Sequence, residues 1–79
     1  MKNLLIENIN MLHTTDGGAD RIRKNLVFGN IDAVEWCRKK ILDANSVIEK
    51  HGKNWYIHSD RYVITVNASS YTIITAHKK

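Results

Sequence analysis

The last third of the chain is dominated by β-branched and aromatic residues, broken at short intervals by turn-forming residues. These residue types suit a pleated, partly buried surface, and the interruptions are typical of hairpins. The pattern predicts strands at residues 47–50, 55–58, 61–67 and 72–77. A four-stranded antiparallel β-meander is therefore the element against which the rest of the chain must fold.

The residues that precede these strands have helical periodicity. Leu5, Ile9 and Leu12 recur on one helical face, which predicts a first helix over residues 4–13. A turn expected at residues 14–18, where two glycines are adjacent, separates it from a short basic helix. That second helix is predicted from residue 19 to about residue 27.

A third helix is predicted from residue 32 to about residue 42, after a stop at residues 28–30. Asp32 and Glu35 have the spacing of a capping box at its start. Helices first and strands afterwards predict an α+β fold, with three N-terminal helices packed on one face of the four-stranded meander. The other face of the sheet is then left open, and functional side chains are expected there.

Length and charge limit the function classes. The 79 residues predict a single domain, with a helical part at 1–43 and a sheet part at 46–79. Lys and Arg number 12 against 8 Asp and Glu, and the net charge of +4 favours an anionic partner such as RNA or DNA. The single cysteine, Cys37, rules out an internal disulfide and favours the cytoplasm, and no apolar stretch is long enough to span a bilayer.

Polar residues of the last two strands are candidates for the open face. Alternation places Thr75 and His77 on the same side of the final strand as Ile73. Thr65 and Asn67 share one side of the preceding strand. The loop between these strands leaves their register ambiguous by one residue, so the sequence does not decide whether the two polar pairs share a face.

Segments spread along nearly the whole chain resemble a small bacterial family of unknown function. They are Leu12-His13-Thr14-Thr15, residues 21–26, Trp36-Cys37, residues 52–58, residues 63–67 and residues 71–77. The order of helices and meander, with a final strand of the form Thr75-x-His77, is also similar to the barnase, colicin and RelE-like group of metal-independent ribonucleases. This second resemblance implies cleavage of RNA through attack by its own 2′-hydroxyl.

Such a reaction requires a base, an acid and fixed positive charge on the phosphate. His77 and His13 are the candidates for proton transfer, and Arg21 is the candidate for holding phosphate. Thr75 completes the predicted catalytic set. The predicted substrate-binding residues are Lys24, Thr65, Asn67 and Tyr56. The sequence has neither close metal-ligand spacing nor a phosphate loop, so no metal and no cofactor are predicted.

Each of these residues also has a plainer structural interpretation. His77 is near the chain end and suits a solvated position, His13 suits a contact with the end of the first helix, and Arg21 suits a solvated helix face. Two other function classes therefore stay open. One is a non-catalytic nucleic-acid-binding module with exposed aromatic residues. The other is a small interaction or inhibitor protein that acts through a sheet edge, as a homodimer or with a partner protein.

Overall fold

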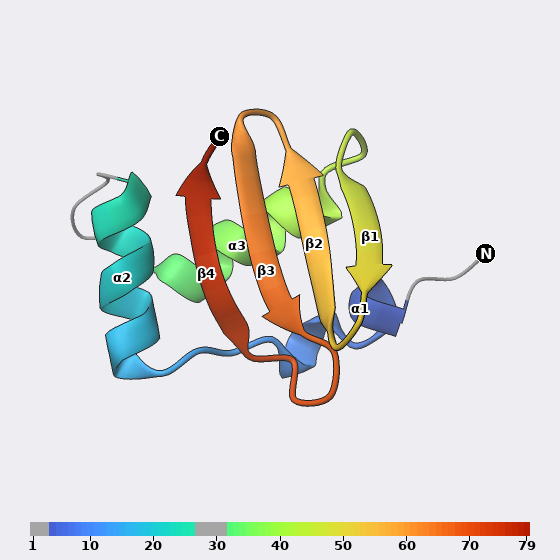
Figure 1. The fold of residues 1–79 in the computed structure, drawn as a ribbon, viewed down its shortest axis with the longest axis horizontal. Coiled ribbons are helices and arrows are strands. Elements are labelled where there is room, and N and C mark those ends of the chain that lie inside the picture. The colour runs from blue at the N-terminus through green and yellow to red at the C-terminus, as the bar shows by residue number, and fades with distance from the viewer. Residues whose placement is uncertain (1–3, 27–31) are drawn as a thin grey trace.

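The computed structural model describes residues 4–26 and 32–79. Its elements, in chain order, are α1 (Leu4–Glu7), the 3-10 helix η1 (Ile9–Met11), α2 (Asp16–Leu26), α3 (Ala33–Leu42), β1 (Val47–His51), β2 (Asn54–Ser59), β3 (Tyr62–Asn67) and β4 (Ile73–Lys78). The strands form one antiparallel sheet in the order β1-β2-β3-β4 (Figure 1). The predicted α+β fold class is confirmed.

Helix α3 lies across one face of the sheet (Figure 1) and begins at its predicted cap, where Asp32 Oδ1 accepts the backbone N–H of Glu35 at 3.1 Å. The buried side chains of α3 join those of the sheet and of the other helices in one core. That core consists of Leu5, Leu12, Ile22, Leu26, Ala33, Cys37, Ile41, Trp55, Ile57, Ile64, Val66, Ile73 and Ala76. Burial raises the pKa of the Cys37 thiol to about 12, so this group acts as a small protonated hydrophobe.

Helix α2 packs along β4 (Figure 1). Its Ile22 and Leu26 side chains are buried. It begins at Asp16, before the predicted start, because Thr15 Oγ1 accepts the backbone N–H of Gly18 at 3.0 Å and so caps the helix. The paired glycines therefore lie in the first turn of α2, and the prediction of a connecting turn at residues 14–18 was wrong over its second half. The predicted stop at residues 28–30 lies outside the described residues.

The predicted first helix is divided into α1 and η1. Its last residues leave the helical path because they pair with the start of β4. The His13 N–H donates to the Tyr71 carbonyl at 3.2 Å, and the Ile73 N–H donates to the His13 carbonyl at 2.7 Å. Long-range backbone bonds have thus replaced local helical ones. None of the helices in the described residues is long and apolar enough to cross a membrane.

The pairing of β3 with β4 contains a β-bulge. Val66 pairs with Ile73 and Thr65 pairs with Thr75, so Ile74 is an extra residue on β4. The prediction that Ile73 shares a side with Thr75 was wrong, because the bulge interrupts the alternation between them. Ile73 is buried in the core and Ile74 is exposed.

Candidate functional site

The face of the sheet opposite α3 has no described helix over it (Figure 1). We call it the open face, and its members follow from the register and from the burial of alternate residues on each strand. They are Val47, Glu49 and His51 of β1, Asn54, Tyr56 and His58 of β2, Val63, Thr65 and Asn67 of β3, and Thr75 and His77 of β4. Polar side chains dominate this surface, and Glu49 is its one carboxylate among the described residues.

The register that the sequence leaves open places the predicted polar residues on one face. Thr65 pairs with Tyr56 on one side and with Thr75 on the other. Val63 pairs in the same way with His58 and His77. Two rows of side chains therefore cross the sheet from β2 to β4, and paired side chains in such rows are about 5 Å apart. Thr65 is 8% exposed because its neighbours in the row cover it.

Helix α2 borders the open face along β4. The side-chain amide of Asn25 donates to Thr75 Oγ1 at 3.4 Å and to the Ala76 carbonyl at 3.5 Å. Arg21 is one turn earlier than Asn25 and so lies on the same side of the helix. Arg21 and Lys24 are both exposed, and neither forms an ion pair with another described residue.

Further cations gather where β4 ends. The backbone N–H of Lys79 donates to the carbonyl of Arg61 at 2.6 Å, and Lys78 pairs with Tyr62. The nearby carboxylate of Asp60 is paired with Lys40 on α3 at 3.1 Å. We call the exposed cations of α2 and of the sheet end near Lys79 the cationic flank: Arg21, Lys24, Arg61 and Lys79. Lys78 is also exposed, but it alternates with His77 and so lies on the α3 side of the sheet.

His13 lies away from His77. Its Nδ1 is 2.8 Å from the Met11 carbonyl and its Nε2 is 3.0 Å from Thr72 Oγ1. Thr72 precedes β4 and His77 is near its end, so the two imidazoles are separated by most of the strand, roughly 15 Å at the usual rise per residue. The structure brings Thr75, His77 and Arg21 to the β4 side of the open face and holds His13 at the far end of that strand.

Sequence reasoning assigned no role to the remaining two histidines. His51 Nε2 and His58 Nε2 each lie 3.5 Å from Glu49 Oε2, and the His51 ring is 5.9 Å from that of Tyr56. Alternation places Glu49 and His51 on one side of β1, and Tyr56 and His58 on one side of β2. The pairing of Glu49 with Tyr56 then brings all four residues to the same face of the sheet. Within the described residues no group of three His, Cys, Asp or Glu side chains is arranged to hold a metal ion.

Comparison with known proteins gives a family and no activity. Residues 6–77 match the model of a family described as "Protein of unknown function (DUF3781)". No curated protein and no solved structure matches the chain.

Proposed function

The chain belongs to the DUF3781 family of proteins of unknown function, and we propose that it binds single-stranded RNA across the open face of its sheet. One observation carries the proposal: the open face borders the exposed cations of α2, because the side-chain amide of Asn25 on that helix donates to Thr75 Oγ1 of β4. A strand laid over the face would have its bases against the sheet and its phosphates beside Arg21 and Lys24. Positive charge placed in this way supplies most of the affinity of nucleic-acid-binding proteins.

The side chains of the open face suit unpaired nucleotides. Tyr56 is at the centre of the face and offers a ring for stacking, since every base has a flat surface. Thr75, His58 and His77 offer hydrogen-bond groups to base edges and to the 2′-hydroxyl. Asn67 can add only its side-chain N–H groups, because its Oδ1 accepts from Ser69 and Ser70 in the β3–β4 loop. These contacts favour a single strand because the bases of a duplex are already stacked and paired.

Metal-independent cleavage of RNA is a second candidate, and one observation favours it. His58 and His77 lie in the same row with Val63 between them, so their backbones are about 10 Å apart, two strand spacings. Imidazoles rooted at that separation can reach opposite sides of one phosphate, as an acid and a base must. His58 thus takes the role that the sequence suggested for His13, with Glu49 beside it to orient the ring.

The test is binding and turnover of labelled RNA by the purified protein in the presence of a chelator. We expect fluorescence anisotropy to give a micromolar Kd for a twelve-nucleotide single strand, and weaker binding to the matching duplex. Substitution of Tyr56 by Ala should weaken single-strand binding by about tenfold, the loss expected for one stacked base. Absence of binding at low salt by the folded protein would refute the proposal.

Turnover distinguishes the two candidates. A ribonuclease would shorten the RNA over hours, and either His77→Ala or His58→Ala would abolish cleavage while the strand still binds. Binding without any shortening of the RNA would support the binding proposal and refute the ribonuclease. Contaminating nuclease is identified by activity that persists unchanged in both histidine variants.

A further inference from the structure

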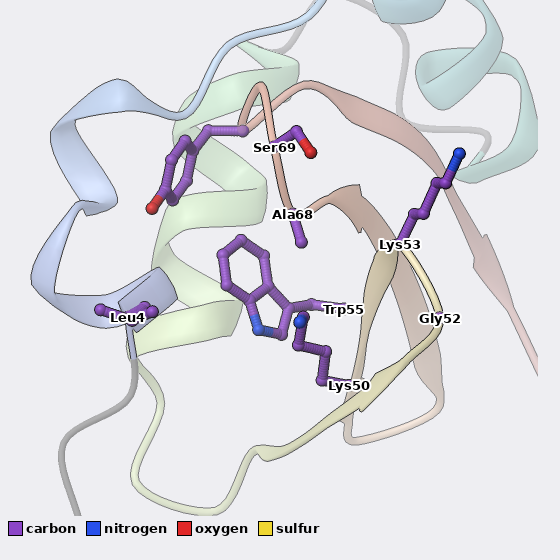
Figure 2. A pocket seen from close by; sticks show the side chains of 8 residues that line it. Leu4, Lys50, Gly52, Lys53, Trp55, Ala68 and Ser69 are labelled. Carbon is purple, nitrogen blue, oxygen red and sulfur yellow. The ribbon is translucent and has the colours of Figure 1, made fainter.

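A pocket of about 500 Å³ lies at the end of the sheet opposite Arg61, between the β1–β2 turn and the β3–β4 loop. Its walls include Leu4, Lys50, Lys53, Trp55, Ser69 and Tyr71 (Figure 2). The backbone holds its two sides together, because the Ala68 N–H donates to the Lys53 carbonyl at 2.8 Å. A volume of this size is typical of small-molecule sites.

Two aromatic side chains form the interior of the pocket. The rings of Trp55 and Tyr71 have centroids 5.3 Å apart at an angle of 40°. Tyr71 has a φ of 59°, a left-handed conformation that is rare for a bulky residue, and it is held there by backbone bonds to Asn67 and His13. Strain of this kind is typical of ligand sites, since surrounding contacts must enforce it. Here it sets the Tyr71 ring against the indole.

Trp55 also offers a hydrogen-bond donor. Its side chain is 4% exposed, and its indole N–H has no hydrogen-bond partner among residues 4–26 and 32–79. Figure 2 shows the indole nitrogen on the side of the ring that faces the space between Leu4 and Lys50. A donor in a mostly buried side chain gains from an acceptor, because leaving it unpaired costs free energy.

The charged side chains that line the pocket are both lysines. Lys50 pairs with Trp55 across β1 and β2, so its side chain lies on the pocket side of the sheet, and Figure 2 shows its amine beside the indole. Lys53 stands at the rim and points outward. No acidic residue lines the pocket, and neither lysine forms an ion pair within the part of the chain that the structure describes. The pocket therefore suits an anion that also carries a planar ring.

We propose that this pocket binds one nucleotide, with the base against Tyr71 and Leu4, a base acceptor on the Trp55 indole N–H, and the phosphate beside Lys50. The nucleotide is either free or the phosphorylated end of a strand, and the second case rests on the proposed RNA binding. The site is separate from the open face, because Trp55 and Lys50 point to the opposite side of the sheet from Tyr56 and Glu49.

The test follows the indole N–H of Trp55 by ¹H–¹⁵N NMR, with the two tryptophan signals assigned from a Trp36→Phe variant. Titration with adenosine 5′-monophosphate should move the Trp55 signal to saturation. Adenosine should bind roughly fivefold more weakly, the loss expected for one partly exposed charge contact, and inorganic phosphate alone should leave the signal in place. No movement of the Trp55 signal at millimolar nucleotide would overturn the proposal.

Charge variants provide the control. Lys50→Gln should weaken nucleotide binding by roughly fivefold and leave adenosine binding unchanged, whereas Lys39→Gln, an exposed lysine on α3, should change neither. Equal affinity of wild type and Lys50→Gln for the nucleotide would refute the placement of the phosphate beside Lys50.

Oligonucleotides separate the two sources. A shift of the Trp55 signal with a 5′-phosphorylated strand, and none with its unphosphorylated twin, supports capture of a strand end. Nucleotide binding without any strand binding supports the pocket and removes the open-face proposal. Strand binding that never shifts the Trp55 signal, together with no response to the mononucleotide, refutes nucleotide binding in the pocket and leaves the open-face proposal in place.

Discussion

The side-chain amide of Asn25 reaches from α2 to the hydroxyl of Thr75, 3.4 Å away on β4. This contact aligns one face of the helix with the open face of the sheet. Arg21, one turn earlier, is carried to the same side. The position of the cationic flank is therefore set by packing between a helix and an edge strand, and β4 is at the same time covered along its outer edge.

Removal of one charge from the flank should weaken RNA binding more than removal of the same charge elsewhere. Lys24 and Lys39 are both exposed helical lysines, on α2 and α3 respectively. Lys24→Ala should lower single-strand affinity by roughly threefold to tenfold and reduce the salt slope by about 0.7, the value for one phosphate contact. Lys39→Ala should change neither quantity. Equal effects of the two substitutions in anisotropy titrations at several salt concentrations would contradict binding at the flank.

The adjacent glycines of α2 should respond in opposite directions to alanine. A methyl group at Gly17 meets nothing within 4 Å, so Gly17→Ala should stabilise the protein by about 0.5–1 kcal/mol through the unfolded chain and helix propensity. A methyl group at Gly18 overlaps Thr14 Oγ1, which donates to the Ile73 carbonyl at 3.0 Å. Gly18→Ala should therefore destabilise by about 1 kcal/mol. Urea unfolding of the pair is the measurement, and the same sign for both would show that α2 begins elsewhere.

Removal of the His13 imidazole should affect stability and leave RNA affinity unchanged. His13→Ala deletes the side-chain contacts with Met11 and Thr72, and we expect a loss of about 1 kcal/mol in the free energy of unfolding. RNA affinity at the open face should stay within twofold of wild type, since the ring lies at the far end of β4. A large loss of binding or turnover with normal stability would return His13 to the functional site.

The buried thiol should make the protein less stable at high pH. Cys37 has its pKa raised to about 12 in the folded chain from 9.0 in the absence of burial. Between these values the unfolded chain loses the thiol proton and the folded chain keeps it, so stability falls as pH rises through 9. The slope from this group is at most about 1.4 kcal/mol per pH unit. Urea unfolding from pH 7 to pH 11 should show a steeper decline for wild type than for Cys37→Ala, and parallel declines would contradict it.

The sequence predicts the sheet well because its evidence is local. Alternating β-branched residues define β2 and β3. Their turn lies at Asp60-Arg61, one residue later than the predicted strand bounds of 55–58 and 61–67 place it, because Ser59 pairs with Tyr62. The cap of α3 at Asp32 is equally local. These signals need no knowledge of distant contacts, so the α+β class and the four-strand order can be derived from them.

The features that the sequence does not predict depend on contacts between distant segments. Leu12 continues the helical spacing of the predicted first helix, which was expected to reach His13. His13 instead forms backbone hydrogen bonds with Tyr71 and Ile73, and these replace a last helical turn. The cluster of Glu49 with His51 and His58 exists only after β1 has paired with β2. The pocket likewise needs Tyr71 and Trp55 to meet across the sheet end. Candidate residues on one strand can be read from alternation, whereas their partners on other elements cannot.

The extra residue at Ile74 bears on how relatives of this chain should be aligned. The bulge absorbs it, so a β4 shorter by that one position would still turn Thr75 and His77 to the solvent and Ile73 and Ala76 to the interior. Loss of the residue at this point therefore leaves the same β4 side chains on the open face and the same ones in the core. The residue of a relative that is equivalent to His77 is therefore the one that pairs with the position of Val63 on β3. Counting residues from the preceding turn would identify a different residue.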